Sequence, residues 1–318
     1  MTTTVSIKSQ APSAPSTDRP AKQRATGRTP GQLAYVPWLY ILPALILVVG
    51  VIYVGIGYTG WVSTLNWNGI DASGQQVGFD NYIAAAQDPV LWQALGHVAI
   101  FGVLSIIIQM VLGMIMAILL TSNAVFARPI YKVILFLPVV LAPAAVATAF
   151  RGILAPDGQF NALLQSLGVP SANAAWLADP HFALYSIAAI NIWQWTGFSF
   201  LLYQAAISQI DQTLFEAAAI DGAGTFKVVR YILLPQLRGT TATLALTGCI
   251  GALKTFDIVY LTTGGGPGRS TEFLTTYIYK EVIEQYHAGY SAALSIILLV
   301  LALVLTTAQI RAYRFGED

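Results

Sequence analysis

The polar and aromatic side chains inside the apolar runs of this sequence are the residues best suited to bind a solute. The densest group is Asn191, Trp193, Gln194, Trp195 and Thr196. Amide groups hydrogen-bond to the hydroxyls of a sugar, and aromatic faces pack against its C–H surface. The cluster therefore suits a transient sugar site. Helix packing through Trp and Gln explains the same residues almost as well, so both interpretations stay open.

A second group of candidates carries charge. Lys254 and Asp257 lie three residues apart in another apolar run. An ionisable side chain at the centre of a bilayer costs about 2.5–3.5 kcal/mol on insertion scales, so each needs water or a partner. As helical neighbours they either neutralise each other or contact a substrate. Lys254 is the only well-placed cation in these runs, which favours a neutral solute over a phosphate ester.

The sequence shows no pattern for covalent or metal chemistry. His97, His181 and His287 are far apart without metal-ligand spacing, and Cys249 is the single cysteine. The stretch Gly264–Thr271 has glycines and a cation but lacks the Gly-Lys-Ser/Thr ending of a phosphate-binding loop. It is interpreted either as a flexible turn or as a docking or gating loop. With no Ser/His/Asp grouping or paired carboxylates at one membrane depth, we expect neither an enzyme nor a metal.

The composition indicates that these residues lie in a membrane protein. Hydrophobic residues make up 56% of the 318 residues and charged residues only 10%, which is more apolar surface than one soluble core can hide. A net charge of +1 without a basic groove argues against nucleic-acid binding. We expect residues 1–32 to form a disordered cytoplasmic tail. Residues 33–315 are predicted to form an all-α membrane domain with six transmembrane helices, at about residues 36–60, 92–120, 132–154, 182–206, 240–261 and 291–311.

Small residues and prolines predict how these helices pack. Gly102, Gly113, Gly248 and Gly251 are expected to let neighbouring helices approach closely in lipid. Prolines at positions 138 and 143 are expected to kink or unwind the third span.

The positions of Lys and Arg predict the orientation of the spans. If the N-terminus is cytoplasmic, 12 of the 16 Lys and Arg residues lie on the cytoplasmic side. The other four, outside or within spans, are Arg151, Lys254, Arg269 and Lys280. Both termini and the loop 207–239 are therefore predicted to be cytoplasmic.

The loop 207–239 contains start and stop signals for two short helices. Asp211 is a predicted N-cap, because its carboxylate can accept from free backbone N–H groups two or three residues on, and the first helix begins near Gln212. An Ala-rich run favours helix, and Gly222 allows a turn that a side chain would obstruct. A second helical stretch, from about Thr225 to Leu233, is predicted to end before Pro235.

This loop resembles the cytoplasmic loop of binding-protein-dependent ABC importer permeases, whose motif reads EAA, three residues, G, nine residues, I-x-L-P. Two further stretches, Ile220–Gly224 and Phe256–Gly268, are similar to the carbohydrate-importing branch, the relatives of the maltose permease subunits. Asp211-Gln212 stands where relatives commonly carry Pro, but an N-cap carboxylate can also start a helix. The resemblance covers about Pro37 to Arg314. The motif residues are Glu216, Ala217, Ala218, Gly222, Ile232, Leu234 and Pro235, with Asp221 beside them.

The resemblance implies a type I importer fold and a complex of several chains in the bacterial plasma membrane. Its other members would be a second homologous permease, two ATP-binding subunits that hold ATP and Mg²⁺, and an extracytoplasmic solute-binding lipoprotein. Glu216 would anchor the loop on an ATPase subunit, and Gly222 would be its hinge. By position relative to the loop, a maltose-permease-like substrate path would include Asn191, Trp195, Phe198, Gly251 and Thr255. The charged residues Lys254 and Asp257 are added to this path as candidate substrate contacts.

The sequence leaves more than one possibility open for the identity of the solute and for the class of transporter. A di- or oligosaccharide is the expected solute, followed by a monosaccharide or amino sugar. A glycerol-phosphate-type solute is a further alternative, since those permeases share the stretch Ile220–Gly224. An ion-coupled secondary transporter would show repeated halves and several buried acids. Asp257 is the only clear intramembrane acid and no internal repeat is visible.

Overall fold

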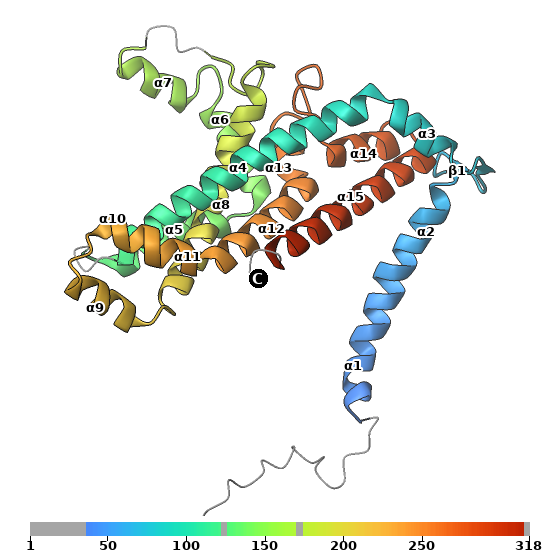
Figure 1. The fold of residues 1–318 in the computed structure, drawn as a ribbon. Helices are drawn as coiled ribbons and strands as arrows, with labels where there is room; N and C mark the ends of the chain where they lie inside the picture. Colours follow the sequence, from blue (N-terminus) through green and yellow to red (C-terminus); the bar gives the residue numbers. More distant parts are fainter. Residues whose placement is uncertain (1–35, 122–125, 170–173, 315–318) are drawn as a thin grey trace, which may run out of the picture. The chain divides into compact units, whose positions relative to one another are not determined.

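The computed structural model describes residues 36–121, 126–169 and 174–314 and is almost entirely helical, as predicted (Figure 1). Among the described residues, strand structure is confined to one antiparallel pair, β1 (Leu65–Asn66) and β2 (Gln75–Gln76), in which Leu65 faces Gln76. The chain divides into two compact units with the boundary between Val54 and Gly55. The predicted tail 1–32 lies outside the described residues.

The described part of the first unit is helical throughout. It consists of α1 (Val36–Leu47) and the π-helical segment η1 (Val48–Tyr53). Helical structure continues through α2 (Val54–Val62), and the run Trp38–Val62 is long and apolar enough to cross a membrane. This run matches the first predicted span.

The second unit begins at Gly55, within α2, and holds β1, β2 and all the helical elements that follow. Their bounds are α3 (Asp80–Gln87), α4 (Pro89–Thr121), α5 (Arg128–Val140), α6 (Pro143–Ile153), α7 (Gln159–Ser166), α8 (Ala183–Ile207), α9 (Gln212–Ile220), α10 (Thr225–Val228), η2 (Val229–Leu233), α11 (Leu234–Gln236), α12 (Arg238–Lys254), α13 (Asp257–Thr262), α14 (Leu274–Ile283) and α15 (Ala288–Arg314).

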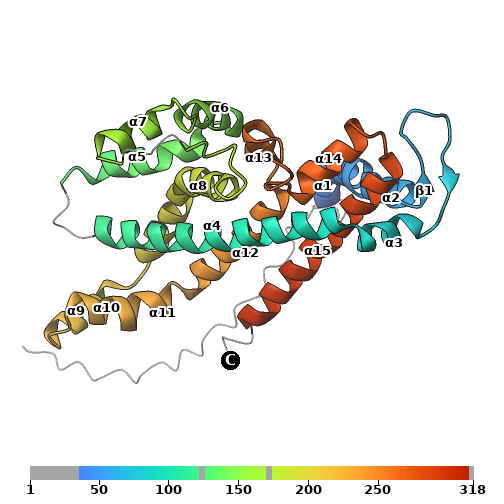
Figure 2. The ribbon, with the colours of Figure 1, turned by 90° about the horizontal axis from the view of Figure 1, so that it is seen from above.

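The core of the second unit forms where α4 packs against α8 and α12 (Figure 2). Glycines bring these helices close: a Cβ on Gly113 of α4 would lie 2.7 Å from the backbone nitrogen of Phe200 in α8. A Cβ on Gly248 of α12 would lie 2.7 Å from the side chain of Ile106 in α4. The expectation that small residues allow close helix approach is confirmed at these two positions.

The predicted third span is not one helix but two. It divides at Leu141–Ala142 into α5 and α6, whose axes differ by 96°. Pro143 begins α6, whereas Pro138 remains inside α5, so the predicted break occurs at the second proline. The side-chain amide of Gln194 in α8 donates to the carbonyl of Leu141 over 3.1 Å. This bond replaces a helical partner that the break removes.

The predicted fifth span is broken as well, which the sequence analysis did not anticipate. Helix α12 ends at Lys254, Thr255 is extended, and α13 begins at Asp257. The hydroxyl of Thr275 in α14 donates to the carbonyl of Thr255. A donor from a distant helix thus satisfies backbone that would otherwise need helical continuation.

The number of spans stays partly a prediction. Within the described ranges, Trp38–Val62, Pro89–Thr121 and Ala288–Tyr313 are long and apolar enough to cross a membrane, and the bent pair α5–α6 counts as a fourth crossing if it forms one span. Helix α8 carries the polar cluster and α12 has only 17 residues. The count of six rests on these two helices crossing as well.

Asp88 joins three parts of the second unit. Its Oδ2 accepts hydrogen bonds from the hydroxyls of Tyr277 (2.6 Å) and Tyr290 (2.8 Å), and its Oδ1 accepts from the backbone N–H of Val90 (2.8 Å). Partial burial acts to raise the pKa of Asp88. The three hydrogen bonds and the charge of Arg269 lower the pKa by more than burial raises it, so the pKa lies below its ordinary value of 3.8. The carboxylate thereby ties the α3–α4 junction to α14 and α15.

Glu272 anchors the glycine-rich loop that precedes α14. Its side chain, 1% exposed, accepts from Lys280 Nζ and from the Thr276 hydroxyl, each over 2.6 Å. Its carbonyl accepts from His97 Nδ1 over 3.0 Å. A Cβ on Gly265, whose φ is +87°, would lie 2.8 Å from both Glu272 Oε1 and Lys280 Nζ. The loop is folded onto this ion pair, which argues against the flexible-turn interpretation.

Candidate functional site

A cavity of about 330 Å³ lies in the second unit, between α4, α8, α12 and the break before α13. It is lined by residues from both broken segments, including Pro143 and Phe256. The structure brings every residue of the predicted substrate path to this one cavity. They are Asn191, Trp195, Phe198, Gly251, Lys254, Thr255 and Asp257.

A pair of side-chain amides forms one wall of the cavity. Gln109 of α4 donates from Nε2 to Oδ1 of Asn191 over 2.8 Å and to its carbonyl over 3.2 Å. Sequence reasoning missed Gln109, although a lone amide in the middle of a 33-residue apolar helix was a usable signal. The pair leaves amide donors and acceptors available to a solute at the cavity wall.

Aromatic rings form an adjoining part of the wall. Trp195 and Phe198 pack edge to face, with ring centroids 6.4 Å apart and an interplanar angle of 83°. Trp195 is 39% exposed, so part of its indole is free to contact a bound molecule. Gln194, Asn191 and Trp195 all line the cavity, and Gln194 is also buried and bonds the helix break. Packing therefore accounts for part of the cluster, and its role as a sugar site stays a prediction.

The two charged residues of the cavity do not pair with each other, which removes one of the two alternatives left open for them. The α12 helix ends between Lys254 and Asp257, and no ion pair joins them among the residues described. Both side chains are exposed. Each instead sits at a helix end that suits its charge, Lys254 in the last turn of α12 and Asp257 in the first turn of α13.

Gly251 serves the cavity rather than helix packing. A Cβ built on it meets nothing within 4 Å, so the expectation of close helix approach is wrong at this position. The residue lines the cavity one turn before Lys254. Its missing side chain leaves room where a solute could lie.

The cavity is equipped for reversible binding. Amides, hydroxyls and aromatic rings line it, and the described part of the chain contains no group of three or more His, Cys, Asp or Glu residues that could hold a metal ion. Such a lining binds polar molecules with apolar faces through hydrogen bonds and ring contacts.

The second candidate region is the loop that contains α9 to α11. Asp211 caps α9 as predicted: its Oδ1 accepts from the backbone N–H of Thr213 over 2.9 Å. This hydrogen bond lowers the pKa of the Asp211 carboxyl. Gly222 has a φ of +68°, so the predicted turn exists and uses a conformation that favours glycine.

The predicted end of the second helical stretch is wrong. Helical structure continues from α10 through η2 into α11, and Pro235 lies inside this run, near the start of α11. A proline lacks the N–H for a backbone hydrogen bond but tolerates the first turn of a helix. The π-helical segment Val229–Leu233 widens the turn ahead of it, which accommodates the ring.

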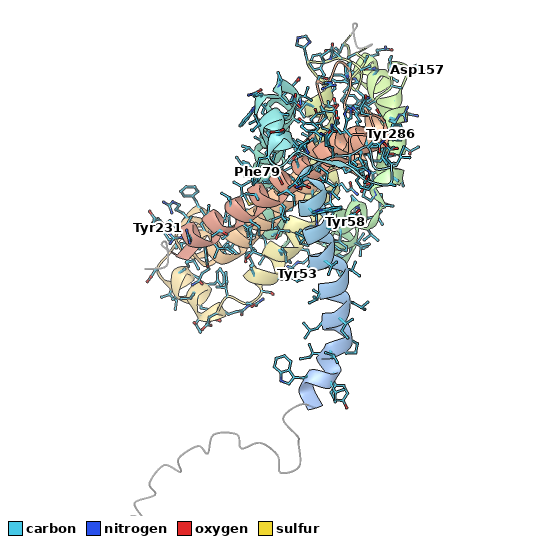
Figure 3. All side chains as sticks on the ribbon, turned by 90° about the vertical axis from the view of Figure 1, so that its right-hand side faces the viewer. Tyr53, Tyr58, Phe79, Asp157, Tyr231 and Tyr286 are labelled. Atoms are coloured by element: carbon cyan, nitrogen blue, oxygen red, sulfur yellow. The ribbon has the colours of Figure 1, made fainter. Side chains whose placement is uncertain are left out.

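Large apolar side chains of this loop are exposed in the single chain. Ile220 is 87% exposed, Phe226 80% and Tyr231 72%. Figure 3 shows Tyr231 at the periphery of the second unit. Glu216 is also exposed, while Ala218 packs inward. Exposed apolar side chains next to a capped helix are typical of a surface that another protein covers. The other motif residues lie in the same region: Ala217 and Asp221 are exposed, and Ile232, Leu234 and Pro235 are half-buried.

The chain is similar to a family of transport proteins, to individual permeases and to a solved transporter structure. The family described as "Binding-protein-dependent transport system inner membrane component" matches residues 109–311. The chain is 32% identical to the probable ABC transporter permease protein YurN of Bacillus subtilis, covering 89% of this chain and 97% of that protein. It is 31% identical to the lactose transport system permease protein LacF of Rhizobium radiobacter, covering 87% and 93%. A crystal structure of the bacterial alginate ABC transporter, in complex with an alginate pentasaccharide-bound periplasmic protein, contains a chain of the same fold, with a TM-score of 0.76, 23% identity and coverage of 86% and 92%.

Proposed function

Because the chain belongs to the family of binding-protein-dependent transport system inner membrane components, the permeases of ABC importers, we propose that it forms half of the pathway by which a carbohydrate enters the cell. Membership in this family excludes the ion-coupled transporter alternative. A second homologous permease would supply the other half of the pathway.

The observation that supports a carbohydrate is the lining of the cavity. The Gln109–Asn191 amide pair and the partly exposed ring of Trp195 meet there. Sugars combine hydroxyls that need donors and acceptors with C–H faces that suit aromatic rings. The name of the LacF relative, a lactose permease, supports the same class.

The α9–α11 loop is proposed to couple this chain to an ATPase subunit. The exposed side chains of Ile220, Phe226 and Tyr231 would dock on that subunit, with Glu216 as the polar anchor. ATP and Mg²⁺ would bind to the two ATPase subunits, so this chain catalyses no step itself. Closure of those subunits would rotate the loop and reorient the helices around the cavity.

This coupling requires the loop to be cytoplasmic, and the excess of Lys and Arg on that side supports the orientation. The glycine-rich loop and α14 would then face outward, toward a solute-binding protein. The complex of the alginate transporter with its periplasmic protein supports such a partner.

The experiment combines topology with coupling. A Cys placed at Ala219, in a Cys249→Ser background, should react with an impermeant thiol reagent only in inside-out vesicles. In the complete transporter, Glu216→Lys should still insert into the membrane, and the ATPase subunits should still bind nucleotide. Sugar-driven ATP hydrolysis and sugar uptake should both fall. Matched Glu216→Gln should retain part of the coupling. Labelling from outside, or normal uptake by Glu216→Lys, would refute the proposed coupling.

A further inference from the structure

Resting on the solute pathway proposed above, we infer that the cavity admits uncharged, hydroxyl-rich solutes and opposes anionic ones, and that Asp257 is the residue that excludes anions. This inference goes beyond a carbohydrate in general, because sugars that carry carboxylates or phosphates belong to the same broad class. It also decides against the glycerol-phosphate-type alternative.

The charge of Lys254 is already balanced within the protein. Lys254 lies in the last turn of the 17-residue helix α12, where unpaired carbonyls carry roughly half a negative charge. Asp257 lines the same cavity three residues later, is exposed, and is not ion-paired with Lys254 in the described structure. The two side chains and the helix end together leave no net positive charge to attract an anion.

The balance between the charges of Lys254 and Asp257 is important because both residues line the cavity. A cleft with low-dielectric walls focuses the field of its charged groups and strengthens their effect on a charged solute. Without the carboxyl group of Asp257, Lys254 would dominate the field and an anionic solute would be drawn in. With that group present, a carboxylate or phosphate that approaches Lys254 also approaches Asp257, which lines the same cavity.

The same cavity offers an unused group to a hydroxyl-rich molecule. Ser105 of α4 lines it, is only 3% exposed, and its Oγ has no hydrogen-bond partner among the described residues. A buried hydroxyl without a partner costs free energy, which a solute hydroxyl would recover because it can both donate and accept. Gln109 lies one helical turn further along α4, on the same face. This strip suits a neutral polyhydroxylated solute.

Local reactivity can test the inference without knowledge of the natural solute. Gly251→Cys in a Cys249→Ser background places a thiol in open space on the cavity wall. Serine at position 249 keeps an acceptor for the amide of Gln309, which donates to Cys249 Sγ. The complete transporter in proteoliposomes is treated with neutral hydroxyethyl methanethiosulfonate or with anionic sulfonatoethyl methanethiosulfonate. Ala162→Cys on exposed α7 is the control for intrinsic reactivity.

The expected result is a lower anionic-to-neutral rate ratio at Gly251→Cys than at Ala162→Cys. Adding Asp257→Asn should raise that ratio by about three- to tenfold, as expected for removing one negative charge from the lining of the same partly wet cavity. Adding Asp257→Glu should leave the ratio low. The ratio does not depend on transport, so it separates this inference from the proposed function, which the uptake of the Glu216→Lys complex tests.

Three outcomes would overturn the inference. One is an anionic-to-neutral ratio at Gly251→Cys equal to or above the control. Another is a ratio that Asp257→Asn leaves unchanged. The third is failure of both reagents to reach Gly251→Cys and a second probe, Thr255→Cys, since the cavity would then not be open to solutes.

Discussion

Gln109 and Asn191 are joined by a 2.8 Å hydrogen bond between their side-chain amides, across the contact of α4 with α8. The bond connects the longest helix of the chain with the helix that carries the polar cluster. It therefore fixes the amide that the cavity presents to a solute.

Replacing Gln109 by Leu should impair transport while the complex still assembles. The substitution keeps the volume but removes the donor to Asn191, and hydrogen bonds between membrane helices contribute about 0.6 kcal/mol on average. The defect should therefore appear mainly as a raised KM for uptake in proteoliposomes. In the Asn191→Leu background, Gln109→Leu should add little, because its partner is already gone. Additive effects of the two substitutions would show that the amides act independently.

Gly222→Val should uncouple ATP hydrolysis from uptake. A left-handed conformation costs a side-chain-bearing residue roughly 1–2 kcal/mol, and the φ of +68° at Gly222 lies in that region. A Cβ there meets nothing within 4 Å, so backbone strain rather than a clash would cause the defect. Gly222→Asn is the matched control, because Asn tolerates this conformation better. Equal uptake by the Val and Asn variants would contradict the explanation.

Acid should loosen the junction held by Asp88. The pKa of Asp88 is lower in the folded chain than its ordinary value of 3.8. Its carboxylate therefore adds stability that is fully present above about pH 4 and disappears as the pH falls through the lower folded pKa. The protection factors of the α14 amides, in which the intrinsic pH dependence of hydrogen exchange is divided out, should fall below pH 4 in the parent protein. Asp88→Asn, which lacks this ionisation, should show a much weaker acid dependence between pH 2 and pH 4; an identical dependence would assign the effect to other groups.

Lys280→Met should make the glycine-rich loop more mobile. It leaves the carboxylate of Glu272, which is 1% exposed, without its charged partner. Removing one member of a buried ion pair costs about 3–5 kcal/mol, and partial exposure of Lys280 places this pair at the low end. Limited proteolysis should cut between residues 263 and 273 faster than in the parent. Combining Lys280→Met with Glu272→Gln should restore much of the protection, whereas equal cleavage of parent and single variant would show that the pair does not hold the loop.

The sequence predicted the parts of this fold whose signals are local. The N-cap at Asp211, the turn at Gly222 and the break at Pro143 depend on neighbouring residues, and each is observed. The break at Thr255 could not be predicted, because a hydroxyl 20 residues away, on Thr275, satisfies the freed carbonyl. The continuation of helix past Pro235 was missed for a related reason: a π-helical segment changes the geometry that proline normally interrupts.

The cavity lining was predicted in its members but not in its arrangement. The family resemblance supplied five residues of the substrate path and the charges inside an apolar run supplied Lys254 and Asp257; all seven line one cavity. Sequence spacing left open whether Lys254 and Asp257 would pair, and the pairing alternative assumed an unbroken helix. Gln109 and Ser105 lie in an apolar helix where periodicity cannot tell a cavity face from a lipid face. Only tertiary packing distinguishes them.

The cap at Asp211 also bears on how readily the neighbouring subunit can be engaged. Helix α9 is already formed in the isolated chain. Binding to the neighbouring subunit therefore does not carry the entropic cost of folding this segment. A preformed helix moves as a rigid body. A movement of the neighbouring subunit would therefore be transmitted to the helices around the cavity with little bending of α9.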